Sequence, residues 1–496
     1  MAINTKGRIL LIFPACLPWF QESNEIGAPI EVESHELPMT PPLGILYIAA
    51  ALLNAGFDVE FVDFEGEDYS PERMISLVEN KNAVGISVAT LARPMVAQIV
   101  RDIRSVRPEI PIVLGGPDIT LCKQLTEGAD VAVIGDATDR VAEVFSKVLA
   151  HEDLSGCPGL LYRSAPGGPV CKSEGAIPPE NLETLPPAAF HLVNPEAYAI
   201  SETRRGKRRL LGVPLMTARG CPFHCAFCCC WQLTENYYQR TAASVLDELE
   251  GLARAGYEVV FILDDTFTAN RKRAEAILDG IAARGLRLIF IMYVRTDTID
   301  EALCRKMRRA GVRLCLFGLE SGTQEVLDFY RKRTHVEQNR RAIQLANRSG
   351  LYCLGFFMMG APMETEEQIR RTIRFAESLP LESAIFRPLY YASPTPLWCD
   401  AEEKGLIGPE ELVCISDSNR GLGKLSAASY IQISLDATRA FQRKPSRFLR
   451  LAFKILWWRD WTFARRFYRV KRASRLTRQV SFGVSTPSSQ LMEKAS

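Results

Sequence analysis

Short apolar runs alternate with longer segments of helical spacing along most of the chain. In the first 150 residues there are five such runs: Ile9–Phe13, Val59–Phe64, Ala83–Val88, Ile112–Leu114 and Val131–Ile134. Strands that are separated by helices form parallel sheets, because each crossover is a helix that covers a face of the sheet. Residues 1–150 are therefore predicted to form an α/β domain with a doubly wound, Rossmann-like parallel sheet.

A second series of six apolar runs again alternates with helical patterns: Leu210–Thr217, Val259–Leu263, Leu288–Tyr293, Leu314–Phe317, Cys353–Met358 and Ile385–Tyr390. Six strand–helix repeats favour a partial (β/α)6 barrel over residues 206–400. A second open sheet is the alternative, because it is built from the same repeating unit. In a barrel of this kind, functional residues lie in the loops that follow the strands.

Two parts of the chain lack this regularity. Between residues 151 and 205 prolines accumulate, which favours a connector without a core of its own: Pro158, Pro166, Pro169, Pro178, Pro179, Pro186, Pro187 and Pro195. Residues 401–496 show no clear strand and are predicted to form a mainly helical, basic C-terminal region. The net charge of the whole chain is only +2, but the segment from Arg443 to Arg478 has 13 basic residues and one acidic residue, Asp460.

Composition places the chain among globular, intracellular proteins. Hydrophobic residues make up 47% and charged residues 24% of the sequence, which excludes a disordered or collagen-like chain. The start shows no secretory signal, and apolar stretches such as Ile45–Leu53 are shorter than the roughly 20 residues that span a bilayer. The 14 cysteines are spread thinly except at 221–230, which indicates a metal site in a reducing, cytoplasmic setting rather than a disulfide framework.

The dense group of cysteines follows the first predicted barrel strand. It reads Thr217-Ala-Arg-Gly-Cys221-Pro-Phe-His-Cys225-Ala-Phe-Cys228, with the spacing C-x3-C-x2-C. Iron–sulfur cubes normally have four thiolate ligands, so three cysteines leave one iron open to a substrate or cofactor. A Cys3His zinc site that includes His224 is one alternative, and three buried free cysteines are another.

This segment resembles the signature of the radical S-adenosylmethionine (SAM) superfamily. The resemblance implies a [4Fe–4S] cluster on Cys221, Cys225 and Cys228, with SAM on the open iron and Phe227 near its adenine. Cys229 and Cys230 lie beyond the family pattern, and are interpreted as inert neighbours, with a second ligand or a substrate-facing thiol as alternatives.

Polar residues at later strand ends match the same family in order. By resemblance, the expected SAM contacts are Asp264, Asp265, Arg295, Glu320 and Ser321. The guanidinium of Arg295 can also make a bidentate hydrogen bond to a carboxylate. The segment from Gly360 to Glu364 is similar to the family's Gly-Leu-Pro-Gly-Glu, with Met363 in place of the second glycine.

The N-terminal series resembles the cobalamin-binding domain that precedes many radical SAM domains. The implied cobalamin contacts lie at strand ends and in the Pro-Pro-Leu-Gly turn: Pro42, Leu43, Gly44, Ser87, Gly115, Gly116, Gly135 and Asp136. Loops there face the ligand crevice of an open α/β sheet, and glycines let a bulky group approach the backbone. The histidine motif that ligates cobalt from below in other cobalamin proteins is absent, and Asp118 stands where relatives often have histidine. A flavodoxin-like module without a ligand is the alternative.

These resemblances imply a cobalamin-dependent radical SAM enzyme. Such an enzyme would methylate an unactivated carbon of a small-molecule or lipid-like substrate through a 5′-deoxyadenosyl radical and methylcobalamin. The alternatives are a cyclase or rearrangement enzyme that does not transfer a methyl group, and a non-catalytic cobalamin or redox sensor. No residue is singled out as catalytic, and a flavodoxin or ferredoxin is expected as electron donor.

The basic C-terminal segment Phe448–Arg469 mixes aromatic residues with cations at helical spacing. The simpler interpretation is a helix whose aromatic face packs on the barrel and whose arginines are solvated. Peripheral contact with an anionic membrane is the alternative. No nucleic-acid recognition motif accompanies the charge, so no nucleic acid is expected as a partner.

Overall fold

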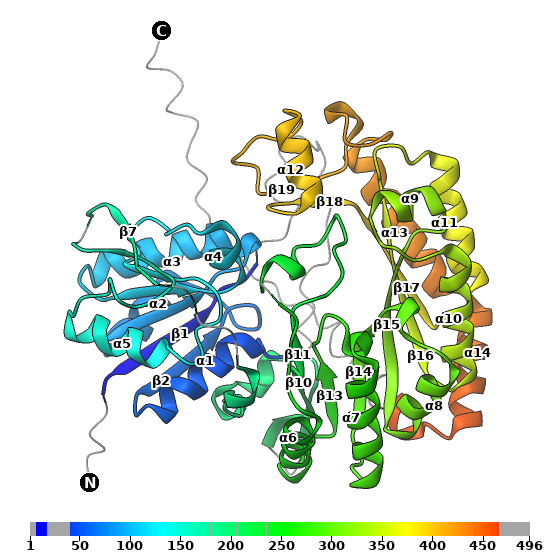
Figure 1. Ribbon diagram of the computed structural model, residues 1–496, viewed down its shortest axis with the longest axis horizontal. Helices are drawn as coiled ribbons and strands as arrows, with labels where there is room; N and C mark the ends of the chain where they lie inside the picture. Colours follow the sequence, from blue (N-terminus) through cyan, green and yellow to red (C-terminus); the bar gives the residue numbers. More distant parts are fainter. Residues whose placement is uncertain are drawn as a thin grey trace.

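Figure 1 shows the computed structural model, in which the N-terminal α/β domain lies on the left and a second strand–helix domain on the right. The described residues are 6–16 and 40–465, except 166, 176, 178–180, 205, 206 and 235.

The described part of the N-terminal domain contains a seven-stranded sheet in the order β2-β1-β3-β4-β5-β6-β7. The first five strands are parallel and lie where the apolar runs predicted them: β1 (Arg8–Phe13), β2 (Asp58–Asp63), β3 (Ala83–Ser87), β4 (Ile112–Gly115) and β5 (Val131–Val133). The helices that connect and flank them are α1 (Leu43–Asn54), α2 (Pro71–Val78), α3 (Arg93–Val106), α4 (Pro117–Cys122) and α5 (Val141–Ala150). Separate apolar clusters on α1 and α5 and on α2 and α3 indicate that helices cover both faces, which confirms the doubly wound sheet.

The first sheet extends further along the chain than the sequence predicted. Strand β6 (Leu160–Arg163) pairs antiparallel with β5, and β7 (Val170–Lys172) pairs antiparallel with β6, within the stretch expected to be a connector. Leu160 is fully buried there and pairs with Val133. The surrounding prolines lie outside the strands, where they interrupt no ladder hydrogen bond, so this part of the connector packs on the neighbouring sheet and extends it beyond residue 150.

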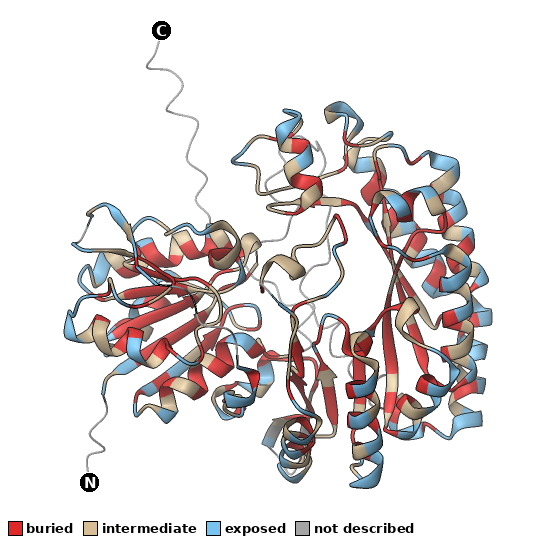
Figure 2. Ribbon diagram, in the orientation of Figure 1, coloured by how far each residue is buried: buried red, intermediate tan, exposed pale blue. Residues whose placement is uncertain are grey.

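The second domain contains a six-stranded parallel sheet in the order β10-β13-β14-β15-β16-β17. The strands are β10 (Gly212–Leu215), β13 (Val259–Ile262), β14 (Ile289–Val294), β15 (Val312–Glu320), β16 (Tyr352–Met359) and β17 (Ser383–Pro388). The helices are α6 (Ala242–Arg254), α7 (Arg271–Ala283), α8 (Glu301–Arg309), α9 (Gln324–Phe329), α10 (Val336–Arg348) and α11 (Glu366–Ser378). Within the described residues β10 and β17 do not pair, so the barrel is a partial one, as predicted. The strands are mostly buried, whereas the outer faces of the helices are exposed (Figure 2).

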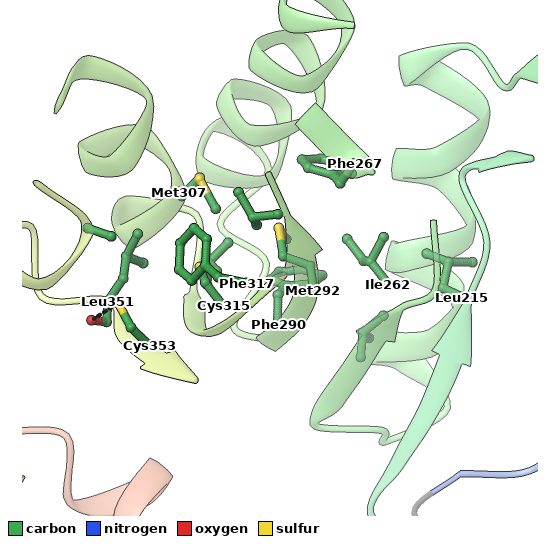
Figure 3. Packing of buried hydrophobic residues seen from close by; sticks show 14 of the residues in the cluster. Leu215, Ile262, Phe267, Phe290, Met292, Met307, Cys315, Phe317, Leu351 and Cys353 are labelled. Atoms are coloured by element: carbon green, nitrogen blue, oxygen red, sulfur yellow. Dashed lines mark hydrogen bonds between the residues drawn. The ribbon is translucent and has the colours of Figure 1, made fainter. Parts of the chain in front are cut away.

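The largest apolar cluster lies between the barrel sheet and its helices. Figure 3 shows Phe290, Met292 and Phe317 on the strands and Met307 on α8, all of which belong to this cluster. Leu46 and Tyr47 of α1 belong to it as well. The N-terminal domain and the barrel therefore share part of one core.

The described part of the C-terminal region, up to residue 465, is mainly helical, as expected. It contains α12 (Pro396–Glu403), α13 (Ala427–Arg443) and α14 (Pro445–Trp458). One strand there was not predicted: β19 (Val413–Ile415), which pairs with β18 (Tyr390–Ala392), since a three-residue strand leaves little periodic signal.

The remaining short strands are β8 (Ser201–Arg204), β9 (Lys207–Leu210), β11 (Ala218–Arg219) and β12 (Tyr238–Gln239). Across residues 6–16 and 40–465, no helix has the length and apolar character needed to cross a bilayer.

The shared core predicts a contrast between two phenylalanines. Phe317 is fully buried, whereas Phe453 is 63% exposed. Truncation of a buried phenylalanine leaves a cavity, so F317A is expected to lower the free energy of unfolding by about 3–5 kcal/mol. F453A is expected to change it by no more than about 0.5 kcal/mol. Urea denaturation of both variants measures the difference, and equal losses would contradict the described packing.

Candidate functional site

The segment of residues 217–228, called the cysteine loop, is held in place by a buried carboxylate just after the neighbouring strand β13. Asp264 is 1% exposed, and its Oδ1 accepts hydrogen bonds from the backbone N–H groups of Thr217 at 2.6 Å and Ala218 at 3.0 Å. The Thr217 hydroxyl donates to its other oxygen. Burial raises the pKa of Asp264, and the hydrogen bonds from Thr217 oppose that rise. Asp264, expected as a SAM contact, thus uses both oxygens to position the start of the loop.

A glycine makes the next turn of this loop. Gly220 has a φ of +87°, and a Cβ atom there would lie 2.3 Å from Oγ1 of Thr234 and 2.7 Å from the carbonyl oxygen of Asn236. Only glycine combines this left-handed conformation with so close an approach. The residue before Cys221 therefore brings the loop against the segment that follows it.

The second half of the loop is tied to the barrel. The backbone N–H of Ala226 donates to the carbonyl of Tyr330 at 2.9 Å, and its carbonyl accepts from Leu397 at 3.0 Å. The ring of Phe227 meets the ring of Tyr330 edge-on, with 5.3 Å between the centroids. Cys225 and Cys228 are thus attached to a fixed backbone.

The three thiols have different electrostatic surroundings. Burial raises the pKa of Cys221 and of Cys225, and the cations of Lys332 and Arg295 oppose the rise at Cys225. Hydrogen bonds from the side chain and backbone of Cys230 lower the pKa of Cys228. Thiolates are the form that binds iron, so Cys228 is the thiol most easily prepared for a cluster.

Cys229 and Cys230 differ in what they contact. The backbone N–H of Cys230 donates to Sγ of Cys228 at 3.5 Å, and the Cys230 thiol, whose pKa is raised by its interaction with Cys228, has its single proton within reach of both Cys228 and the carboxylate of Asp265. Burial raises the pKa of Cys229 to about 11. Cys230 therefore links Asp265 to a predicted cluster ligand, a role that the cysteine spacing alone did not indicate.

A charged network lies beside Cys225. Two nitrogens of the Arg295 guanidinium, Nε and Nη2, donate to the carboxylate of Asp297 at 2.9 and 2.7 Å. Nη2 also donates to the carbonyl of Lys332 at 2.9 Å, and Nη1 lies 3.8 Å from Sγ of Cys225. Arg295 therefore makes a bidentate hydrogen bond to a carboxylate, as the sequence indicated, but that carboxylate is the side chain of Asp297 and not part of a ligand.

Lys332 joins this network to the end of β15. Its Nζ lies 2.8 Å from Oε1 of Glu320, and both side chains are buried. Glu320 has a φ of +60°, a left-handed conformation that costs a residue other than glycine roughly 1–2 kcal/mol. Such strain persists where the surroundings hold it, and it clusters at functional sites. Lys332 was not predicted, because Arg331-Lys332-Arg333 has the composition of a solvated surface turn.

Ser321, which was also expected to contact SAM, lies in the protein interior. It is fully buried, and its hydroxyl exchanges hydrogen bonds with the hydroxyls of Thr323 and Thr372, both at 3.1 Å. Its side chain thus holds the turn after β15 against α11.

Polar atoms without partners line the segment after the cysteines. Within the described residues, four buried atoms there have no hydrogen-bond partner: Nε1 of Trp231, Oε1 of Gln232, Oγ1 of Thr234 and the hydroxyl of Tyr237. A buried polar group without a partner costs about 1–3 kcal/mol, so such atoms suit a site that a polar ligand fills. Tyr237 also lies near Cys221 and Asp265. These residues were missed because they belong to no motif, and only their position directly after the cysteines could have indicated them.

The predicted cobalamin loops include open and strained glycines. A Cβ atom at Gly44 or Gly115 would meet nothing within 4 Å. Gly116, by contrast, has a φ of +105°, and a Cβ there would lie 2.8 Å from the carbonyl oxygen of Val88. The open backbone at Gly44 and Gly115 fits a bulky ligand, whereas Gly116 is needed for the turn itself.

The remaining residues expected at cobalamin are placed as follows. Leu43 is buried in the core shared with the barrel, Pro42 and Ser87 are half-buried, and the N–H of Gly135 donates to Oγ1 of Thr120 at 3.0 Å. Asp118 is buried and pairs with Nε of Arg93 at 2.7 Å. Asp118 is therefore an anionic side chain that is balanced by an arginine.

An ion pair connects the two candidate cofactor regions. Arg219, two residues before Cys221, pairs with Asp136 in the loop after β5. Burial lowers the pKa of Arg219 to about 10. The pair brings the predicted cobalamin loops and the cysteine loop to the same boundary between the two domains.

The cysteines do not converge on one point. Among residues 6–16 and 40–465, no three cysteine, histidine or carboxylate side chains are grouped so as to hold a single metal ion. His224 instead meets the ring of Trp231 at a centroid distance of 4.9 Å. The ligands of an iron–sulfur cube bind different irons, so this donor set fits a cluster better than it fits a Cys3His zinc site.

Comparisons with known proteins agree with both domains. Residues 38–145 match the family model of the B12 binding domain, and residues 215–376 match that of the Radical SAM superfamily. The chain is 29% identical over 369 residues to an uncharacterized methyltransferase of Pyrococcus horikoshii, which covers 72% of this chain and 78% of that protein.

The chain is also similar to a cyclase in sequence and to a methyltransferase of known structure. The chain is 29% identical over 348 residues to the anaerobic magnesium-protoporphyrin IX monomethyl ester cyclase of Rubrivivax gelatinosus, which covers 68% of this chain and 62% of the cyclase. The methyltransferase TsrM of Kitasatospora setae, solved with its tryptophan substrate and a SAM analog, has a TM-score of 0.61 at 22% identity. That alignment covers 80% of this chain and 76% of TsrM, and it establishes a common fold.

A B12-binding domain followed by a radical SAM domain implies three cofactors, namely cobalamin, SAM and a [4Fe–4S] cluster, as expected from the sequence. The thiols, the open glycines and the polar atoms without partners suit these groups. The chain therefore belongs to the radical SAM superfamily, among the enzymes that carry a B12-binding domain ahead of the radical SAM domain.

Proposed function

We propose that this enzyme methylates an unactivated carbon of a small-molecule or lipid-like substrate. The observation that carries the proposal is the Arg219–Asp136 ion pair, which joins the cysteine loop to the glycine-ended loops of the B12-binding domain. A reaction that uses a radical and a methyl donor needs both cofactors at one substrate carbon. The methyltransferase names of two relatives support the same proposal.

Three groups of residues would hold the cofactors. Cys221, Cys225 and Cys228 would bind the cluster, and the open backbone at Gly44 and Gly115 would border cobalamin. When bound, the cluster and SAM supply a 5′-deoxyadenosyl radical, and cobalamin supplies a methyl group. The protein contributes orientation and the exclusion of water.

The residues around Cys225 have a defined part in this proposal. Arg295 and Lys332 surround that thiol with positive charge, and Glu320 holds the ammonium group of Lys332 at 2.8 Å. Positive charge next to thiolates favours their deprotonated form. Phe227 and Asp265 border the same loop and remain the proposed contacts of SAM, together with Arg295 and Glu320, whereas Asp264 and Ser321 would act by holding the backbone in place.

A second candidate function is cyclisation or rearrangement without methyl transfer. The relative in Rubrivivax gelatinosus is a cyclase, which favours this alternative. Both reactions need an external electron, so a flavodoxin or ferredoxin as donor and a cytoplasmic location remain part of the proposal.

The cluster assignment predicts the result of removing thiols. The C221A/C225A/C228A variant is expected to lose the roughly four irons of the cluster and its broad visible absorption after anaerobic reconstitution. The C171A/C399A/C414A variant also lacks three thiols, all half-buried and outside the cysteine loop, and should keep both the iron and the absorption. Iron analysis and absorption spectra provide the measurement. Retention of the cluster by the first variant would refute the assignment.

The cobalamin assignment predicts a steric effect at Gly115. A leucine there would project into open space on the proposed binding face, so G115L is expected to weaken cobalamin binding roughly ten-fold or more. A Cβ atom at Gly251 on α6 would likewise meet nothing within 4 Å, so G251L serves as the control that should bind normally. Titration with hydroxocobalamin, followed by its absorption, gives both affinities. Equal affinities would count against cobalamin at this face.

Methyl transfer predicts the products formed from SAM. A methyltransferase of this kind uses one SAM for the methyl group and one for the radical, so S-adenosylhomocysteine and 5′-deoxyadenosine should form in about equal amounts. Methyl-labelled SAM should pass its label to the substrate. Mass spectrometry of reactions with candidate substrates or cell extract measures all three. 5′-Deoxyadenosine without S-adenosylhomocysteine or transferred label would support the cyclase alternative instead.

A further inference from the structure

Helix α14 presents its apolar residues to solvent. Phe448 is 74% exposed, Trp457 71%, Leu449 67%, Phe453 63% and Leu456 56%. Successive members are one, three or four residues apart, which places them on one side of the helix. The rings of Phe453 and Trp457 stack with 5.9 Å between their centroids. The aromatic face was expected to pack on the barrel, and for these residues that expectation is wrong.

Cations occupy the buried side of the same helix. Lys454 is 6% exposed, and its Nζ donates to the carbonyl of Leu351 and to Oε1 of Glu382, both at 2.7 Å. Arg447 is 7% exposed and donates to the carbonyl of Leu381 at 3.0 Å. Its guanidinium lies 3.3 Å from the centroid of the Phe441 ring.

These buried contacts fix the orientation of α14. Rolling the helix to bury its aromatic residues would break the Lys454–Glu382 ion pair and leave Glu382 without this cation. Loss of one partner from a buried pair is strongly unfavourable. The apolar face is therefore held outward by the fold.

The only acidic residue in the sequence between Arg443 and Arg478 is Asp460, and its charge is neutralised by arginines. Asp460 is 7% exposed, and its carboxylate pairs with Arg308 at 2.7 Å and Arg313 at 3.2 Å. Four other basic residues within α14 or near it in the sequence are exposed, namely Arg443, Arg450, Arg459 and Arg465. Residues 466–478, which lie outside the described residues, add six basic residues and no acidic one.

We propose that α14 docks the enzyme on the surface of an anionic lipid bilayer. Exposed aromatic and aliphatic side chains that are bordered by arginines match such a surface, where rings enter the headgroup region and cations meet lipid phosphates. An apolar patch of this size is unusual on a protein that binds nothing. The inference goes beyond the proposed reaction and holds for either chemistry, because α14 contacts the starts of β16 and β17 rather than the cysteine loop.

The test uses the full-length, reconstituted enzyme in flotation assays with lipid vesicles. The wild type is expected to bind vesicles that contain phosphatidylglycerol at least roughly ten-fold more tightly than vesicles of phosphatidylcholine alone, and to be released by high salt. The F448S/F453S/W457S variant is expected to bind phosphatidylglycerol vesicles at least roughly ten-fold more weakly, because these side chains supply the apolar contact.

A matched control keeps the result specific. The I75S/V106S/V170S variant also removes three exposed apolar side chains, and it should bind vesicles like the wild type. Unchanged cluster and cobalamin spectra establish that each variant is folded. The proposal is overturned if the wild type does not bind, if it binds both kinds of vesicle equally, or if the α14 variant binds normally. A dimer in solution that only the α14 variant disperses would also overturn it, because a second copy would then cover this face.

Discussion

The carboxylate of Asp264 fixes the point at which the chain leaves the barrel sheet and enters the cysteine loop. Strand β10 is the edge of that sheet, so the backbone beyond it has a neighbour on one side only. Asp264 provides acceptors for Thr217 and Ala218 where the ladder stops. Without it, two buried N–H groups would lose their partners, at a cost of about 1–3 kcal/mol each. The residues that follow directly are Arg219, which reaches the other domain, and the first cysteine.

Charge is distributed around this loop in a consistent way. Cations lie beside Cys225, whereas Cys228 is hydrogen-bonded by Cys230. The loop therefore offers positive charge at one ligand and a thiol with a lowered pKa at another. Both arrangements favour the thiolate form, against the burial that raises the pKa of Cys225 and the negative charge of Asp265 that opposes ionisation of Cys228.

Most of the architecture could be predicted from the sequence, because buried parallel strands form continuous apolar runs that differ clearly from amphipathic helices. The cysteine loop could be predicted because its function depends on local spacing. The roles of Asp264, Arg295 and Ser321 could not be predicted in the same detail. Their partners Thr217, Asp297 and Thr372 are identified by tertiary packing, whereas a strand-end position indicates only that a polar residue faces the site.

The orientation of α14 illustrates a second limit. Its spacing identifies an apolar side, but the usual assumption that this side is buried fails, because Glu382 and two backbone carbonyls select the basic side instead. The strands β6 and β7 illustrate the same limit. Strand β6 pairs with β5 and β7 pairs with β6, and the local sequence of the proline-rich stretch does not indicate this pairing.

The core shared between α1 and the barrel has a consequence for how such proteins can be recombined. Leu43, Leu46 and Tyr47 are at once part of the first α/β domain and part of the packing of the second. A B12-binding domain transplanted from a relative would have to bring a matching apolar surface and a partner for Arg219, or the chimera would carry a bare apolar face and a buried cation without its counter-charge. The two domains of this chain are therefore expected to be inherited and exchanged as a unit, although each resembles a separate module in sequence.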